Sequence, residues 1–165
     1  MNKATATSPC DSPCAEALDA LDVLAQGLEQ TRVLADECRR FARAVACDQG
    51  MQKVAEALCR AIHRMASLEE ELLYPAAREA LTGSSAVAMA ELEHATARAI
   101  IHQMQMTDPR EARYGALVVA LTDCVERHAN QEQAELFPQV RAAHMDLSEL
   151  GERLTVRQQQ LGTLA

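Results

Sequence analysis

Residues 64–75 and residues 127–138 are two copies of one sequence pattern. In both copies an arginine, an alanine, a glutamate, a leucine, an aromatic residue and a proline stand at the same offsets. The copies differ most at one position, which is Met65 in the first copy and His128 in the second. The second copy therefore contains His-x-x-x-Glu, whose side chains lie on one face of a helix and can bind one metal ion. The repeat predicts a bundle of two related halves, with these metal-binding residues intact in only one half.

A second and weaker correspondence extends the repeat along the chain. Leu28 and Arg32 have the same spacing as His94 and Arg98, and each pair precedes its own copy of the pattern by a similar distance. Once more the first half has an apolar residue where the second half has a histidine. This match adds weight to the two-half organisation because it follows nearly the same offset as the stronger repeat.

The composition favours helices over strands. Hydrophobic residues make up 48% of the chain and aromatic residues only 2%, and strong helix formers such as Ala, Leu, Glu, Gln and Arg are abundant. Apolar residues recur at helical spacing, and no segment alternates as a half-buried strand would. We predict helices over about 13–45, 51–80, 85–106, 109–144 and 147–161. Short connections between the four long helices predict an all-α fold, an antiparallel up-down four-helix bundle with a short C-terminal fifth helix.

Prolines suggest where these helices begin and where they are disturbed. Ser12-Pro13 and Asp108-Pro109 each combine an N-cap residue with a proline suited to the first helical position. We therefore expect the first and fourth helices to begin there. Pro75 and Pro138 fall inside the second and fourth helices, where proline cannot donate the helical hydrogen bond and should interrupt the helix.

Length and charge narrow the class of protein. A chain of 165 residues can bury its own core, so we predict one domain over residues 12–165 and a disordered segment over residues 1–11. The net charge of −8 and the pI near 5.1 argue against nucleic acid as a partner. No run of 18 apolar residues predicts a membrane span. Residues 1–9 lack the apolar core of a secretion signal, so we expect a cytoplasmic location.

The six cysteines stand at positions 10, 14, 38, 47, 59 and 124. In a cytoplasmic protein we expect them to be reduced. Cys10 and Cys14 are either unpaired thiols near the chain end or a redox-active or metal-binding pair. Cys124 lies one helical turn before His128 on the same face, and it is either a small core residue or a thiol beside a metal site.

The residues best suited to hold a metal are histidines and glutamates of the repeat. His128 and Glu132 are one helical turn apart, and the two-half symmetry places Glu69 opposite Glu132. An inward Glu69 requires a cation or a proton, because a buried carboxylate is otherwise costly. The competing interpretation is a solvated acidic face, since Glu69 opens the run 69–71. His94 is likewise either a ligand or an ordinary histidine of the surface or core.

The chain resembles a hemerythrin-like (HHE cation-binding) domain over about residues 15–160. The motifs that carry the similarity are Asp19-Ala20-Leu21-Asp22-Val23-Leu24 in the opening helix, Leu72-Leu73-Tyr74-Pro75 downstream of Glu69, Glu93-His94, His128-x-x-x-Glu132, and Glu135-Leu136-Phe137-Pro138. The resemblance implies a four-helix bundle around a non-haem di-iron centre. In that family one histidine from each helix and two bridging carboxylates supply the ligands, and members bind O2 or NO, sense oxygen or redox state, or handle iron.

Carried over residue by residue, the resemblance implies four metal ligands, namely Glu69, His94, His128 and Glu132. Leu28 and Met65 replace the histidines of the first and second helices. Arg98 stands where some members carry a further histidine on the third helix. Because both lost histidines belong to the first half, we expect one metal position to be lost and the other to survive.

The resemblance, together with the two lost histidines, implies a protein that binds one iron ion per chain, with zinc and manganese as alternatives. We expect a sensor of the bacterial type, a binder of small ligands such as O2 or NO, or an iron-handling protein. An iron oxidase or a peroxidase is the enzymatic alternative, and we expect it less than a non-enzymatic role. The competing hypothesis is a metal-free degenerate bundle that acts as a regulatory or interaction module. The sequence identifies no protein partner.

Overall fold

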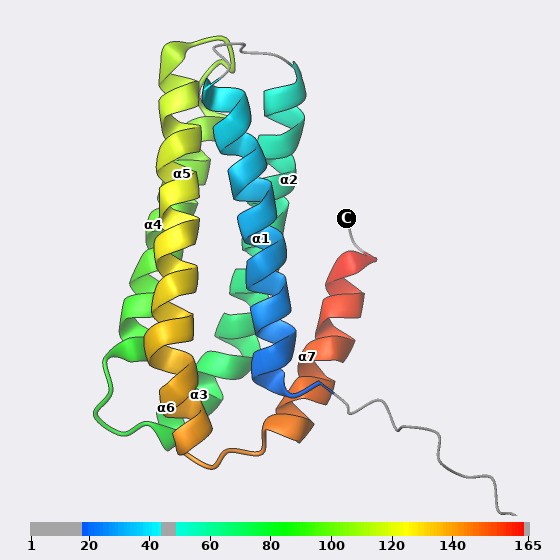
Figure 1. The fold of residues 1–165 in the computed structure, drawn as a ribbon, viewed down its shortest axis with the longest axis vertical. Coiled ribbons are helices and arrows are strands. Elements are labelled where there is room, and N and C mark those ends of the chain that lie inside the picture. The colour runs from blue at the N-terminus through cyan, green and yellow to red at the C-terminus, as the bar shows by residue number, and fades with distance from the viewer. Residues whose placement is uncertain (1–17, 44–48, 164–165) are drawn as a thin grey trace, which may run out of the picture.

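The structure, a computed structural model, describes residues 18–43 and 49–163. These residues form α-helices and two short π-helical turns, and no β-strand occurs among them (Figure 1). In chain order the elements are α1 Ala20–Arg43, α2 Gln49–Leu68, η1 Glu69–Leu73, α3 Tyr74–Ala80, α4 Ala86–Gln105, α5 Ala112–Gln131, η2 Glu132–Leu136, α6 Phe137–Ala142 and α7 Leu147–Gly162.

The four long helices form an antiparallel bundle. α1 packs against α2 and α5, and α4 packs against α5. Beyond the π turns, α3 and α6 continue the paths of α2 and α5 to the lower end of the bundle in Figure 1. α7 then runs back alongside α1 and α2. The predicted all-α bundle with a short C-terminal helix is therefore confirmed.

Each of the two prolines that the sequence places inside a helix follows a π turn. The N–H of Tyr74 donates to the carbonyl of Glu69, and the N–H of Phe137 donates to the carbonyl of Glu132. These bonds span five residues where an α-helix spans four. A proline has no N–H, and its ring clashes with the carbonyl four residues earlier, so a wider turn before it accommodates both effects. The predicted interruption thus takes the form of a π turn within a continuous helical segment.

The first helix begins later than the sequence predicted. Leu18 and Asp19 are not helical, and Oδ1 of Asp19 accepts hydrogen bonds of 2.9 Å from the N–H groups of Leu21 and Asp22. Asp19 is therefore the N-cap of α1. The expected start at Ser12-Pro13 is wrong for residues 18 and 19, and residues 12–17 lie outside those described.

The fourth long helix also begins later than predicted. Asp108 starts a turn, because its carbonyl accepts from the N–H of Glu111 and its Oδ1 accepts from the N–H of Arg110. α5 begins only at Ala112, and its N-cap residue, Glu111, has an extended backbone. The side chain of Asp108 is used to close the turn, so the Asp-Pro motif precedes the helix and does not cap it.

Other boundaries lie within a few residues of those predicted. α2 begins at Gln49, slightly before the predicted start at residue 51. Asp146 caps α7, since its Oδ1 accepts from the N–H of Glu149 at 2.9 Å. The predicted disorder of residues 1–11 and the predicted break after residue 45 fall largely on residues outside those described.

Buried apolar side chains form two clusters, one toward each end of the bundle. The lower cluster in Figure 1 includes Leu24 of α1 and Leu154 of α7. The upper cluster includes Leu58 of α2 and Leu121 of α5. The core is polar between these clusters, and the candidate site lies there.

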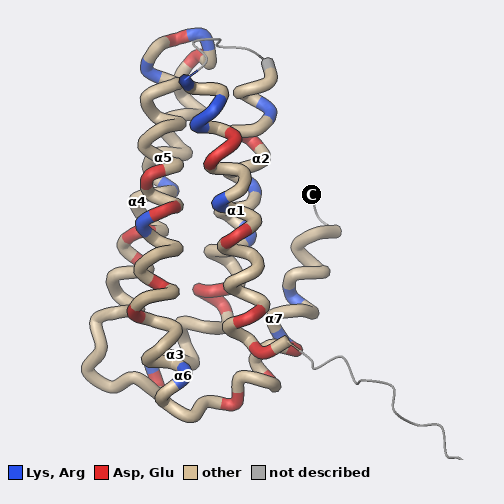
Figure 2. Tube along the Cα trace, in the orientation of Figure 1, with Lys and Arg blue, Asp and Glu red and all other residues tan. Residues whose placement is uncertain are grey.

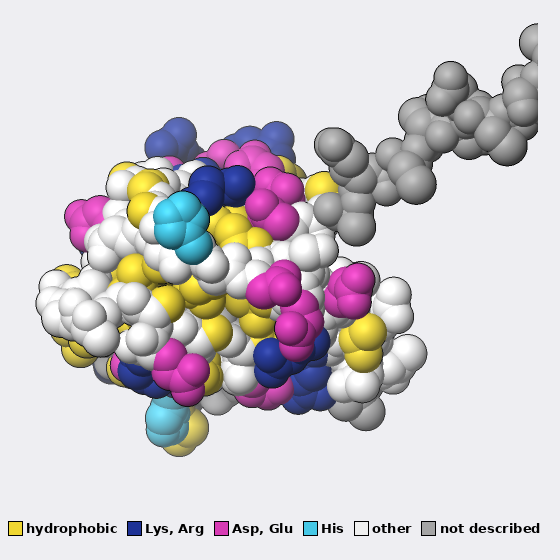
Figure 3. Space-filling view, turned by 90° about the horizontal axis from the view of Figure 1, so that it is seen from below, with side chains coloured by type: hydrophobic (Ala, Val, Ile, Leu, Met, Phe, Trp, Pro, Cys, Tyr) yellow, Lys and Arg dark blue, Asp and Glu magenta, His cyan; other side chains and the backbone are white. Residues whose placement is uncertain are grey.

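The surface is mixed in charge. Acidic and basic residues are interspersed along the helices (Figure 2), and the lower end of the bundle shows charged side chains of both signs among apolar ones (Figure 3). Within the part of the chain that the structure describes, we find no helix whose length and apolar character suit a membrane span.

Candidate metal centre

Polar side chains occupy the middle of the bundle, between the two apolar clusters. The buried members of this group are Thr31, Glu69, Glu93, His94 and Glu132. The side chain of His128, which faces them, is 12% exposed. A buried charge is costly unless it is paired or binds a metal, so this concentration of carboxylates and imidazoles requires a physical explanation.

The two π turns carry the two central carboxylates into the core. Glu69 is the first residue of η1 and Glu132 the first residue of η2, and both side chains are fully buried. Glu70 is only half-buried, and Glu71 is exposed and binds Arg157 through both carboxylate oxygens. The acidic run therefore divides, and Glu69 alone reaches the centre of the bundle.

The side chains of both histidines meet Glu69. Nε2 of His94 lies 3.0 Å from Oε2 of Glu69, and Nε2 of His128 lies 3.5 Å from the same oxygen. Nε2 of His128 also lies 3.7 Å from Oε2 of Glu132. The ligand atoms of Glu69, His94 and His128 all lie within 4.8 Å of one another. The structure thus brings Glu69, His94 and His128 into one close group, and Glu132, the fourth residue that the sequence singled out, lies just outside this group beside His128.

Several of these facing atoms lack a hydrogen-bond partner. They are both carboxylate oxygens of Glu69, Oε2 of Glu132 and Nε2 of His128. The approach of the imidazoles to Glu69 is close but lacks the direction of a hydrogen bond. Leaving a buried polar group unpaired costs about 1–3 kcal/mol, and more when the group is charged. Imidazole nitrogen and carboxylate oxygen are donors that suit iron, zinc and manganese, so the donor set fits a transition-metal ion.

Each imidazole has its Nδ1 atom, the nitrogen that faces away from Glu69, in contact with a carboxylate. Nδ1 of His94 lies 2.8 Å from Oε1 of Glu70, which also accepts from Arg98 at 2.8 Å. Nδ1 of His128 lies 3.2 Å from Oε2 of Glu93. A carboxylate that accepts from Nδ1 holds the ring and leaves Nε2 as the metal-facing atom, an arrangement common around metal-binding histidines.

Arg127 in turn contacts Glu93, since its Nε lies 3.4 Å from Oε1 of Glu93. Both histidines therefore have an Arg–Glu pair behind them. Sequence analysis missed these positioning roles of Glu70 and Glu93. The available signal was the arginine at position 98, one helical turn after His94, which needed an acidic partner from a neighbouring element.

Tyr74 places a further donor at the centre. Its hydroxyl donates to Oε1 of Glu132 at 2.9 Å and lies 3.4 Å from Nε2 of His94. The side chain is fully buried, and burial together with the charge of Glu69 raises the pKa of the hydroxyl. Tyr74 therefore remains a protonated donor, and it occupies one oxygen of Glu132 while the other faces His128. The sequence pointed to Tyr74 only as part of a family motif.

The central groups shift one another's pKa values. Burial would raise the pKa of Glu69, but the adjacent His128 and His94 lower it to about 2. Burial opposes the charge on His128, yet Glu69 and Glu93 outweigh that effect and raise its pKa to about 11. Burial and the charge of Glu69 raise the pKa of Glu132 well above its ordinary value. Near neutral pH the imidazole of His128 therefore holds a proton when no metal is bound, and a cation that binds Nε2 would displace it.

The two positions that lack histidine are filled by apolar side chains. Leu28 and Met65 are 2% and 7% exposed. Both line a cavity of about 30 Å³ whose wall also includes His94 and His128. The apolar residues that replace histidine in the first half and the imidazoles of the second half therefore line the same cavity.

The remaining histidines and cysteines lie elsewhere. His63, His102 and His144 are exposed. Cys124 is buried, and its thiol donates to the carbonyl of Glu93 at 3.7 Å, so it lies beside the centre as a core residue and outside the close ligand group. Cys10 and Cys14 lie outside the described residues.

Comparison with known proteins agrees with this arrangement. The model of the Hemerythrin HHE cation binding domain matches residues 15–140. Among solved structures, the chain is similar to a Hemerythrin HHE cation binding domain-containing protein from Mycobacterium kansasii, with a TM-score of 0.74 and 22% identity over 87% of each chain. At this identity the likeness supports the fold alone. A search of curated proteins found no match.

The family match covers more than half of the chain and includes both π turns and the four residues that meet at the centre. The matched range also contains both copies of the sequence repeat, each with a glutamate ahead of an aromatic-proline pair. This chain belongs to the hemerythrin HHE cation binding domain family.

Proposed function

We propose that the protein binds one iron ion through Glu69, His94, His128 and Glu132, and that this site serves a sensing role through O2 or NO, or a role in iron handling. The observation that carries the proposal is the set of buried, unpaired atoms that face one another. Oxygen atoms of Glu69 and Glu132 and Nε2 of His128 have no hydrogen-bond partner in the interior. A cation supplies the partner that these atoms lack.

The proposed stoichiometry follows from the first half of the bundle. Leu28 has no donor atom, and Met65 offers only a thioether, which suits copper(I) or haem iron better than a carboxylate-bound iron. Both side chains are buried among other apolar residues. One metal ion per chain is therefore expected, with zinc and manganese as alternatives to iron.

Neighbouring residues prepare the centre for a ligand. Glu70 and Glu93 hold the imidazoles through Nδ1, and Tyr74 holds one oxygen of Glu132. An iron ion held by these two histidines and two glutamates would still have coordination positions open to a small molecule. The adjoining cavity of about 30 Å³ exceeds the space that one water molecule needs and is mostly apolar in its lining, which favours a small uncharged ligand.

Thermal unfolding with and without a chelator tests the proposal. The iron-loaded wild-type chain should lose stability when the chelator is added, because a metal bound only to the folded state stabilises it. His94→Ala should unfold at a temperature that the chelator does not change. His102→Ala is the matched control, since His102 is an exposed histidine of the same helix, and it should behave as the wild type.

The alternative is a metal-free bundle that acts as a regulatory or interaction module. The observation that favours it is the filling of two ligand positions by Leu28 and Met65, which removes half of the family's histidines. This alternative predicts that the chelator leaves the unfolding temperature of the wild type and of both variants unchanged. That result would contradict the proposed metal site.

A further inference from the structure

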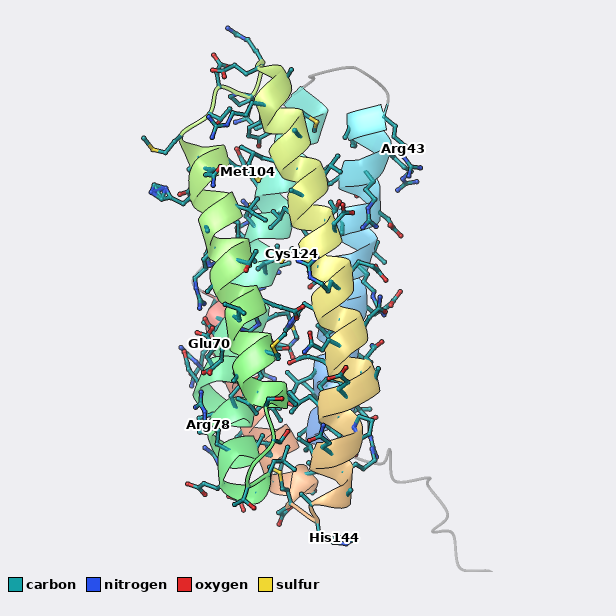
Figure 4. All side chains as sticks on the ribbon, turned by 90° about the vertical axis from the view of Figure 1, so that its left-hand side faces the viewer. Arg43, Glu70, Arg78, Met104, Cys124 and His144 are labelled. Carbon is teal, nitrogen blue, oxygen red and sulfur yellow. The ribbon has the colours of Figure 1, made fainter. Side chains whose placement is uncertain are left out.

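The repeat in the sequence also relates contacts within the bundle, with α1 corresponding to α4 and α2 to α5. Arg98 of α4 donates to Glu70 at 2.8 Å, and Figure 4 shows Glu70 beside that helix. The corresponding residues of the other half are Arg32 and Gln133. They make the same contact, since Nη1 of Arg32 donates to Oε1 of Gln133 at 3.0 Å. The two halves can therefore be compared contact by contact.

One ion pair of the second half has no counterpart in the first half. Oε1 of Glu93 lies 3.4 Å from Nε of Arg127. The corresponding residues of the first half are Gly27 and Arg64, and a glycine has no carboxylate. Among the residues that the structure describes, Arg64 makes no hydrogen bond or ion pair through its side chain. The first half thus keeps the arginine and lacks the carboxylate that pairs with it.

A groove lies beside the position of the missing carboxylate. It has a volume of about 90 Å³ and lies between α1, α2 and α7, and both Gly27 and Arg64 line it. A Cβ atom added at Gly27 would overlap Sδ of Met65, so the methionine takes the space next to the backbone of α1. The groove beside it exceeds the space that one water molecule needs. A small molecule can therefore lie next to Arg64.

The lining of the groove indicates what kind of molecule fits. Among the described residues that line it, Arg64 alone is charged, and Gln30 and Gln158 add carboxamide groups that can donate hydrogen bonds. A planar guanidinium binds a carboxylate through two parallel hydrogen bonds. The other side chains are mostly apolar and favour a hydrocarbon tail over a fully hydrated anion such as phosphate, and they are Leu34, Ala61, Met65, Leu68 and Leu161.

We propose that the groove between α1, α2 and α7 binds a short-chain monocarboxylate. Its carboxylate pairs with the guanidinium of Arg64, as Glu93 pairs with Arg127 in the second half. Its hydrocarbon chain lies against the apolar residues of the groove, among them Leu161 of α7. α7 runs alongside α1 and α2 in Figure 1 and so forms one side of the site. The site uses no metal ligand, so it is independent of the proposed iron centre.

Saturation-transfer NMR on the full chain, which observes the signals of added butyrate, tests the proposal. One ion pair and a few apolar contacts support a dissociation constant on the order of 1 mM. Arg64→Gln should weaken butyrate binding at least about tenfold, because it removes the charge that pairs with the carboxylate. Arg60→Gln is the matched control, since Arg60 is an exposed arginine of the same helix that does not line the groove, and it should bind butyrate as the wild type does.

Two competing molecules define the chemistry of the site. Butyramide has the size of butyrate without its charge, and it should bind at least about tenfold more weakly. Inorganic phosphate at the same concentration should not displace butyrate. Equal binding of butyramide, or displacement by phosphate, would overturn the assignment to a monocarboxylate. Butyrate that bound the candidate metal centre would bind Arg64→Gln as well as the wild type, and that result would also overturn the proposal.

A carboxylate built into the chain provides a second measurement. Gly27→Glu places a carboxylate where Glu93 stands in the second half, and it should abolish butyrate binding. Gly27→Gln has the same size without the charge. Gly27→Glu should therefore unfold at a higher temperature than Gly27→Gln, and the difference should vanish when Arg64→Gln is added to both, because this cycle isolates the pair. A difference that persists without Arg64 would contradict the proposed pairing.

Discussion

At the scale of single residues, neighbours in one acidic run have different roles. Glu69 lies wholly inside the bundle, Glu70 accepts from Nδ1 of His94, and Glu71 binds Arg157 at the surface. From the sequence, residues 69–71 could form either a solvated acidic face or a source of metal ligands. The π turn that begins at Glu69 decides the matter, because it sets which of the three carboxylates points inward.

The contact between Glu70 and His94 predicts a selective effect on metal affinity. Glu70→Gln should weaken metal binding about 10- to 100-fold, because loss of the carboxylate behind the imidazole weakens its orientation and basicity. Glu71→Gln should retain wild-type affinity, since the exposed carboxylate of Glu71 binds Arg157 of α7 and lies away from the imidazoles. Competition with a coloured chelator measures both affinities, and equal losses in the two variants would contradict a positioning role for Glu70.

The raised pKa of His128 predicts that metal affinity increases with pH. Its pKa is raised from 6.5 to about 11, so Nε2 keeps its proton at neutral pH and must release it when a metal binds. Acid therefore opposes binding, and the apparent affinity for Zn²⁺ should rise about tenfold for each pH unit between pH 6 and pH 8. Competition titrations at three pH values, corrected for protonation of the chelator, measure the slope. A flat profile would show that His128 already presents an unprotonated nitrogen.

At the scale of elements, close approach of the backbone determines where helices begin and how they pack. A Cβ added at Gly151 of α7 would lie 2.8 Å from the carbonyl oxygen of Leu18 and 2.9 Å from the backbone nitrogen of Ala20. The start of α1 therefore fits against α7 only because residue 151 has no side chain. This contact also places the first turn of α1 at Ala20, next to the Asp19 cap.

Two glycine substitutions should have opposite effects on stability. Gly151→Ala should destabilise the fold by about 1–3 kcal/mol, because the added methyl group meets backbone atoms that cannot rotate away. Gly115→Ala should stabilise it by about 0.4–1 kcal/mol, since Gly115 lies within α5 and its Cβ would meet no atom within 4 Å. Urea unfolding measures both changes, and a stable Gly151→Ala variant would contradict the packing of α7 described above.

The sequence predicted the number of long helices and their approximate spans well because apolar residues recur at helical spacing. The sequence placed the first residues of α1 and α5 too early, and the reason lies in the choice of N-cap residue. Asp19 and Asp108 are both acceptable N-cap residues, and only packing decides which of them caps a helix. The sequence did not predict that the helices would contain π turns. A π turn adds one residue to a single helical turn, and this hardly changes the spacing of apolar residues along the helix. The only sign of it in the sequence was the proline that follows each turn.

At the scale of the whole molecule, the two halves have the same order of helices and π turns but different side chains at the metal-facing positions. Each half has a π turn that carries one glutamate inward, and the second half adds His94 and His128. The repeat made this asymmetry visible in the sequence, including the apolar replacements at Leu28 and Met65. For the carboxylates behind the imidazoles the sequence offered only the indirect signal of Arg98, because Glu70 and Glu93 reach the imidazoles from other elements of the bundle.

The metal content of the chain tests the account most directly. Protein produced with iron supplied, and without affinity-tag histidines, should contain about one metal ion per chain by elemental analysis, since one half retains its imidazole donors. His128→Ala should lose that ion while it keeps a helical circular dichroism spectrum. Two ions per chain would show that the first half still binds metal despite Leu28 and Met65. A folded wild-type chain without metal would contradict the proposed centre.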